Sequence, residues 1–146
     1  MKVRELMTTE PTSVEPNATL GEVATLMKQD DCGSIPVVQS GRLVGIVTDR
    51  DIVIRGIAAG SDPKTQRVSA IMSADPVTTG PDKDVTEAEK VMADRQIRRL
   101  PVVENGKLVG IIVTAQIARA GDKQMVGETL KKISEPTSGR ASHARG

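Results

Sequence analysis

Apolar residues recur with helical spacing in two stretches of the chain. The first has apolar residues at positions i, i+3, i+4 and i+7, and the second is sparser: Leu20, Val23, Ala24 and Met27, then Val85, Ala88 and Met92. Thr19 stands three positions before Glu22, and Asp84 three before Glu87. This is the spacing of a capping box, which satisfies free backbone N–H groups at a helix start. We therefore predict a helix at each position, with its apolar stripe facing a core.

Two pairs of short apolar runs have the pattern of β-hairpins. The runs and their turns are 35–38 and 43–47 around Ser40-Gly41, and 100–103 and 108–113 around Asn105-Gly106. Residues rich in valine and threonine after Pro11 and Pro76 predict one strand ahead of each helix. A second helix is predicted after each hairpin, ending near Gly60 in the first unit and near Gly121 in the second. The predicted order of strand, helix, strand, strand and helix occurs twice and indicates an α+β fold.

The duplication is visible directly when the chain is shifted against itself by 65 residues. Residues 3–52 and 68–117 then align without a gap, with fifteen identities in fifty positions. The densest match pairs Pro36-Val37-Val38 with Pro101-Val102-Val103. Since an internal repeat fixes the architecture before any single motif does, we predict two pseudo-symmetric units.

The repeat and the composition between its copies suggest five segments. We expect a first domain over 1–60, a polar linker over 61–67 that contains Pro63, and a second domain over 68–121. Residues 122–133 are weakly amphipathic and predict a C-terminal helix. Residues 134–146 have no apolar periodicity and predict a disordered tail.

Composition excludes several classes of function. Twenty basic and nineteen acidic residues leave a net charge of +1, which argues against nucleic acid as a partner, as does the absence of every aromatic residue. The only histidine, His143, lies in the predicted tail, so histidine catalysis and multi-histidine metal sites are not expected. A single cysteine, Cys32, fits a reducing compartment, and no apolar run is long enough for a membrane span or a signal peptide. We expect a cytoplasmic protein.

The repeated unit, with its Pro-Val-Val strand, its hairpin and the Gly45-Ile-Val-Thr-Asp-Arg-Asp51 sequence, resembles the CBS domain, named after cystathionine β-synthase. CBS domains occur in pairs called Bateman modules, and residues 55–63 resemble the linker of free-standing bacterial pairs of the hypoxic-response and general-stress type. The resemblance implies a regulatory, non-catalytic homodimer. It also implies a sensor of AMP, ADP or ATP, with NAD and S-adenosylmethionine less favoured, and no required cofactor or metal.

The resemblance implies a ligand motif of a hydroxyl residue, two variable residues and Asp at the start of the helix after the hairpin, and here it is Thr48-Asp49-Arg50-Asp51. A helix N-terminus offers N–H groups to a phosphate, the Thr48 hydroxyl can add a hydrogen bond, and the Asp51 carboxylate can accept both ribose hydroxyls. Arg50 can pair with phosphate oxygens. The structural alternative is that Thr48 only caps the helix and Asp51 only stabilises its first turn. The spacing alone favours this alternative, and only the duplicated family context reverses the preference.

Further site residues follow from the resemblance, in which each cleft draws on both repeats. Gly33, Ser34 and Ile46 line the cleft from the first repeat, and Val77 and Ile97 clamp the adenine from the second. Arg98 and Arg99 either face the phosphates or form a solvated pair at a strand start, and the sequence leaves both interpretations open. Val113 and Gln116 stand where the first repeat has Thr48 and Asp51, so we expect the second cleft to be weak or empty.

Two other functions remain to be tested against nucleotide sensing. One is a ligand-free module whose paired repeats serve only to dimerise and to dock on a partner enzyme or channel. The other is an enzyme, which has little support because no motif combines a nucleophile with a base. The sequence does not identify the nucleotide, the regulated partner or the orientation of a dimer.

Overall fold

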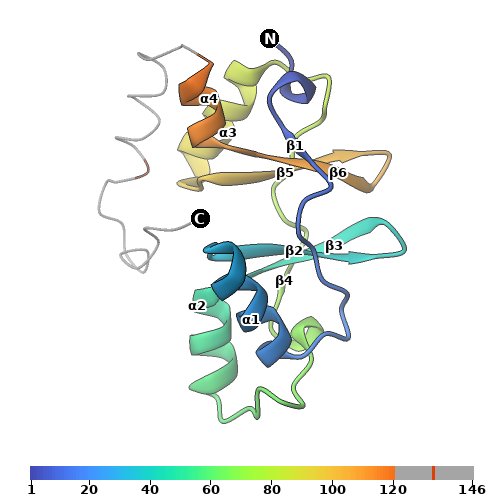
Figure 1. Cartoon of the computed structure of the whole chain (residues 1–146), viewed down its shortest axis with the longest axis vertical. Coiled ribbons are helices and arrows are strands. Elements are labelled where there is room, and N and C mark those ends of the chain that lie inside the picture. Colours follow the sequence, from blue (N-terminus) through green and yellow to red (C-terminus); the bar gives the residue numbers. More distant parts are fainter. Residues whose placement is uncertain (121–132, 134–146) are drawn as a thin grey trace. The chain divides into compact units, whose positions relative to one another are not determined.

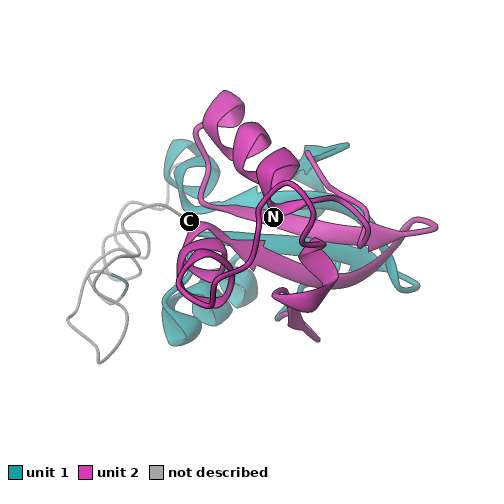
Figure 2. Ribbon diagram, turned by 90° about the horizontal axis from the view of Figure 1, so that it is seen from below, with its two compact units in different colours: residues 1–11, 77–146 teal, residues 12–76 magenta. Residues whose placement is uncertain are grey.

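A computed structural model describes residues 1–120 and residue 133 of the chain. The chain divides into two compact units: unit 1 combines Met1–Pro11 with Val77–Gly146, and unit 2 is Thr12–Pro76 (Figure 2). The predicted tail over 134–146 lies outside the described residues, as does the predicted helix over 122–133 except for its last residue.

Unit 2 is an antiparallel sheet with helices on one face (Figure 1). Its elements in chain order are α1 (Leu20–Asp30), β2 (Ser34–Gln39), β3 (Arg42–Thr48), α2 (Asp49–Asp51), the π-helix η2 (Ile52–Ile57), the 3-10 helix η3 (Val68–Ala70) and β4 (Ser73–Ala74). Strand β3 lies in the middle and pairs with β2 on one side and β4 on the other.

Unit 1 repeats this plan. Its elements are the 3-10 helix η1 (Val3–Glu5), β1 (Thr8–Thr9), α3 (Val85–Arg95), β5 (Arg99–Glu104), β6 (Lys107–Val113) and α4 (Thr114–Arg119). Strand β6 is central and pairs antiparallel with β5 and β1. Both units therefore have the predicted α+β composition.

The predicted helices are confirmed, with one difference in the buried stripe. Thr19 and Asp84 are the N-caps of α1 and α3, and each side chain accepts a backbone N–H from the first turn. Leu20, Val23 and Met27 are buried as predicted, but Ala24 is exposed. Leu26 packs against the core of unit 2 instead. The three predicted apolar residues of α3 are all buried, together with Glu89, which is only 1% exposed.

Both predicted hairpins are confirmed. Ser40 and Gly41 have φ values of 54° and 81°, and Asn105 and Gly106 have 53° and 80°. Positive φ at both central residues defines the turn whose twist matches that of the flanking strands. Cys32 is buried in the core of unit 2, where it acts as a small packing residue.

The strands predicted after Pro11 and Pro76 are wrong, because β1 and β4 come before these prolines. Glu10 and Asp75 have left-handed φ values of 50° and 52°, which end each strand. A proline then follows that has no N–H to donate to a ladder. After the prolines, single parallel bridges remain at Val14 and Thr79, to Val37 and Val102 respectively.

The compact units differ from the sequence repeats because each unit takes its short strand from the other repeat. Strand β1, from the first repeat, pairs with β6, and β4, from the second, pairs with β3. Glycines allow these segments to approach closely. A Cβ built on Gly110 would lie 2.7 Å from Sδ of Met7, and one on Gly45 would lie 2.6 Å from Sδ of Met72. Both distances are too short for a real side chain.

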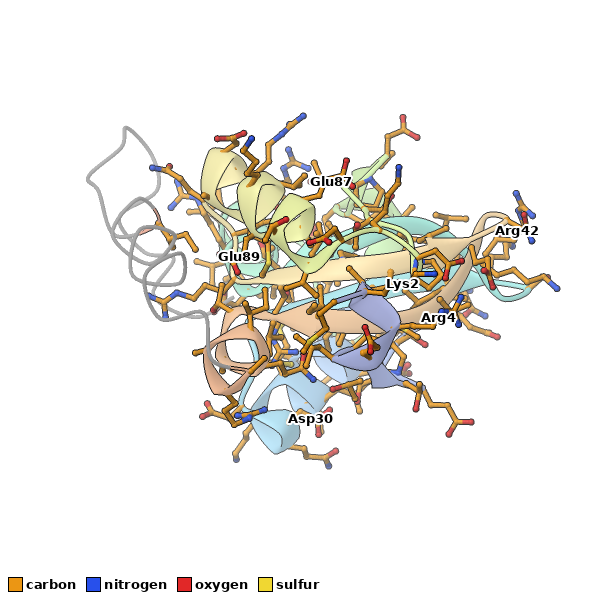
Figure 3. The ribbon with its side chains drawn as sticks, turned by 90° about the horizontal axis from the view of Figure 1, so that it is seen from above. Lys2, Arg4, Asp30, Arg42, Glu87 and Glu89 are labelled. Atoms are coloured by element: carbon orange, nitrogen blue, oxygen red, sulfur yellow. The ribbon has the colours of Figure 1, made fainter. Side chains whose placement is uncertain are left out.

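Ion pairs fasten the N-terminal segment to the rest of unit 1. Nε of Arg4 donates to Oδ1 of Asp82 at 2.9 Å, and Nζ of Lys2 lies 3.7 Å from the same oxygen. Lys2 and Arg4 both lie on the N-terminal segment (Figure 3). The hydrogen bond from Arg4 lowers the pKa of Asp82 below its usual value. Hydrogen bonds from the backbone and hydroxyl of Thr86 lower the pKa of the Asp84 carboxyl in the same way.

Candidate functional site

The helix start at Thr48 is held by a reciprocal capping box. Thr48 is the last residue of β3 and the N-cap of α2, and its Oγ1 accepts the N–H of Asp51 at 3.0 Å. In return Oδ2 of Asp51 accepts the N–H of Thr48 at 2.9 Å. The structural role that the sequence suggested for these residues is therefore present. It leaves Oδ1 of Asp51 outside the cap, on a side chain that is 15% exposed.

The helix that follows the motif changes to a wider form after one turn. In η2 the N–H of Ala58 bonds to the carbonyl of Val53 at 2.8 Å, five residues earlier. In unit 1, α4 is an α-helix over Thr114–Arg119. Short π-helical segments occur frequently at functional sites. The wider turn follows directly after the candidate ligand motif.

Several predicted site residues of the first repeat come together around this helix start. The N–H of Asp49 donates to the carbonyl of Gly33 at 2.9 Å, so the loop before β2 is tied to α2. Ser34 is buried and lies opposite Thr48 in the β2–β3 register. Ile46 lies on β3 two residues before Thr48 and therefore on the same face of the sheet. Arg50 is exposed on the first turn of α2.

In unit 1 the residue at the position of Asp51 is Gln116, and its side chain forms two hydrogen bonds within the protein. Oε1 of Gln116 accepts the N–H of Val113 at 2.9 Å. Nε2 of Gln116 donates to Oγ1 of Thr8 at 2.7 Å. Thr8, on β1, was not expected to take part, because the sequence does not reveal which unit contains β1. These bonds engage both ends of the Gln116 amide.

The remaining predicted site residues belong to unit 1. Val77 and Ile97 are half-buried and pack against its core. Arg99 is the first residue of β5, opposite Val113. The carbonyl of Arg98 accepts the N–H of Thr114 at 3.1 Å, just as Gly33 accepts that of Asp49.

Arg98 also carries an unusual buried group. Its Nε is buried and has no hydrogen-bond partner among the residues that the structure describes. Arg98 and Arg99 are both half-buried, which differs from the solvated pair considered as the alternative. A buried N–H without an acceptor is costly, so such groups call for an explanation.

Arg55 is a neighbour of the motif that the sequence analysis missed. Its Nε lies 3.9 Å from Oδ1 of Asp51, one helical turn earlier. The signal was present in the sequence, because an acidic residue four positions before a basic one is the favourable order for an ion pair on a helix.

Two kinds of feature were sought among the described residues, a cluster of metal ligands and a membrane-spanning helix. Within residues 1–120, no three histidine, cysteine or acidic side chains are grouped so that they could hold a metal ion. None of the described helices has the length and apolar character of a membrane span.

Comparison with known proteins decides the family. The sequence profile of the CBS domain matches residues 3–56 and, a second time, residues 68–123. The chain belongs to the CBS-domain family. It is 43% identical over 133 residues to the CBS domain-containing protein YhcV of Bacillus subtilis, covering 90% of this chain and 94% of YhcV. CBS pairs are in general regulatory modules, and the comparisons indicate no catalytic family.

Solved CBS-pair structures have the same fold. The crystal structure of Hypoxic Response Protein I with two coordinated zinc ions is 37% identical, with a TM-score of 0.75, covering 82% of this chain and 98% of that one. The structure of a hexameric CBS-CP12 protein from bloom-forming cyanobacteria is 33% identical, with a TM-score of 0.68, covering 84% of this chain and 72% of that one. This CBS pair therefore resembles free-standing proteins along most of its length.

Proposed function

We propose that this CBS pair is a non-catalytic sensor that binds AMP, ADP or ATP through the helix start at Thr48. The observation that carries the proposal is the Asp51 carboxylate, which is largely buried yet keeps Oδ1 outside the capping box. A carboxylate with an available oxygen is a strong acceptor for ribose hydroxyls. The equivalent Gln116 is engaged with Thr8, so one binding site per chain is proposed.

The other site residues have distinct roles in this proposal. Ile46 supplies aliphatic surface for the adenine, since the chain has no aromatic residue to stack on it. Arg50, exposed on the first turn of α2, neutralises the phosphates. The reducing cytoplasm, where these nucleotides are abundant, fits the buried Cys32, which forms no disulfide.

A ligand that binds only the folded state must raise the melting temperature. We expect AMP or ATP at a hundred times its dissociation constant to stabilise the protein by about 2.7 kcal/mol. For a chain of this size that corresponds to a rise of roughly 5–10 °C, measured by differential scanning fluorimetry with an external dye. GTP serves as the control for non-specific anion binding. If no adenine nucleotide raises the melting temperature, the ligand-free docking module becomes the better interpretation.

We also infer that the chain forms a homodimer through the outer face of η2. Val53, Ile54 and Ile57 are 54%, 51% and 50% exposed, which places three large apolar side chains in water on one short helix. A twofold arrangement buries the same patch on both subunits. The solved CBS-CP12 hexamer is a relative whose chains assemble.

Replacing Ile54 with glutamate should therefore convert the dimer to a monomer, because a charge would have to be buried in the interface. Light scattering coupled to gel filtration measures the mass at micromolar concentration. Lys107→Glu is the control, since Lys107 is exposed on the β5–β6 hairpin. A parent protein that already has the mass of a monomer contradicts the inference.

A further inference from the structure

Arg55 is held in place at two points of unit 2. Its Nε lies 3.9 Å from Oδ1 of Asp51, and Nη1 of the same guanidinium donates to the carbonyl of Ile71 at 3.3 Å. Ile71 is buried and follows η3, so its carbonyl belongs to a fixed part of the unit. The guanidinium therefore connects the carboxylate to the backbone of a different segment.

The two contacts of Asp51 together fix the plane of its carboxylate. Oδ2 is held by the N–H of Thr48 at 2.9 Å, and Oδ1 faces Arg55. An acceptor that is already oriented loses less side-chain freedom when a ligand binds, which increases affinity. The favourable order of the pair, acidic residue first and basic residue four positions later, supports the same geometry.

The second repeat lacks both members of this pair. Gln116 stands at the position of Asp51, and Ala120 stands at the position of Arg55. The loss of the arginine together with the carboxylate is the pattern expected if Arg55 serves Asp51.

We propose that Arg55 is a positioning residue of the ligand site, which orients Asp51 to accept the hydroxyls of a ribose. This inference rests on the proposed nucleotide site and adds to it the requirement for a ribonucleotide. The side chain of Arg55 is 55% exposed, so its effect is that of a surface ion pair, modest and sensitive to salt. It acts on the ribose through Asp51.

Arg55→Ala should weaken AMP binding by about two- to five-fold, the range expected for an exposed ion pair. It should weaken binding of 2′-deoxyadenosine monophosphate less, because that ligand offers Asp51 one hydroxyl fewer. The preference for AMP over 2′-deoxyadenosine monophosphate, given by the ratio of their dissociation constants from titration calorimetry, should therefore fall towards one. A purely structural role for Arg55 would lower both affinities equally.

Arg67→Ala is the matched control. Arg67 lies in the same unit and also donates from Nη1 to a backbone carbonyl, that of Asn17 at 3.4 Å, but it forms no ion pair with Asp51. Arg67→Ala should leave the preference for AMP over 2′-deoxyadenosine monophosphate unchanged. In a double-mutant cycle, Arg55→Ala should have no further effect once Asp51 is alanine.

The outcomes separate the two proposals. If Asp51→Ala binds AMP as the parent does, the proposed nucleotide site is wrong. If Asp51→Ala weakens binding but Arg55→Ala leaves both affinities unchanged, only the role of Arg55 is wrong. An effect of Arg55→Ala that persists in the Asp51→Ala background would mean that Arg55 contacts the ligand directly, which also overturns the positioning role.

Discussion

Replacing Asp51 with alanine is expected to weaken the binding of AMP and ATP by roughly ten- to a hundred-fold. Hydrogen bonds to a charged acceptor contribute about 1.5–3 kcal/mol, and ~1.4 kcal/mol corresponds to one decade of affinity. Titration calorimetry measures the change. Gln116→Ala is the matched control, because Gln116 has the same place in the second repeat but is bonded to Thr8. It should change affinity far less.

The structure refines the design of this experiment. Asp51→Ala also removes part of the helix cap, because Oδ2 of Asp51 accepts the N–H of Thr48. Asp51→Asn keeps an oxygen for this bond while removing the charge, so it separates lost affinity from a weakened helix start. Two equivalent, equally tight sites per chain, or unchanged affinity in Asp51→Ala, would contradict the assignment.

A large loss of folding stability is expected when a side chain is added at Gly110. Gly110→Ala should destabilise unit 1, because the new Cβ would lie 2.7 Å from Sδ of Met7 and 2.8 Å from the carbonyl oxygen of Thr8. The backbone of β1 would have to move, and overpacking of this kind costs about 1–3 kcal/mol. Urea denaturation and thermal melting measure the loss. Gly45→Ala should act in the same way on unit 2, since its Cβ would meet Met72 and the carbonyl of Ser73.

Gly80→Ala provides the control within unit 1. Its nearest neighbour would be Cγ of Lys83 at 3.5 Å, an ordinary contact, and its φ is not positive. The substitution also reduces the freedom of the unfolded chain, so we expect a stability equal to or slightly above that of the parent. Equal stability of the Gly110→Ala and Gly80→Ala variants would mean that β1 does not pack tightly against β6.

Local signals in the sequence predicted most of the fold. The N-caps at Thr19 and Asp84 and the turn at Asn105-Gly106 depend on neighbouring residues, and the structure has all three. The ligand motif at Thr48 came from the family resemblance, since its spacing alone favours a plain helix cap. Its grouping with Gly33 and Ser34 follows from the hairpin register, which the turn fixes.

The features that the sequence did not reveal depend on distant contacts. Strands β1 and β4 have two residues each, too few for a period-two pattern, and their partners lie far along the chain. The bond between Gln116 and Thr8 joins residues 108 positions apart. Arg55 was missed although its spacing from Asp51 is local, because the carbonyl that fixes it belongs to Ile71, sixteen residues away.

The exchange of short strands between the repeats sets an order of events during synthesis. All of unit 2 lies in one continuous stretch, Thr12–Pro76, so it can fold once that stretch has left the ribosome. Unit 1 needs both Met1–Pro11 and the residues from Val77 onwards. Strand β1 is therefore made early but must wait for β6, and the entropy of closing that long loop makes unit 1 the slower half to assemble.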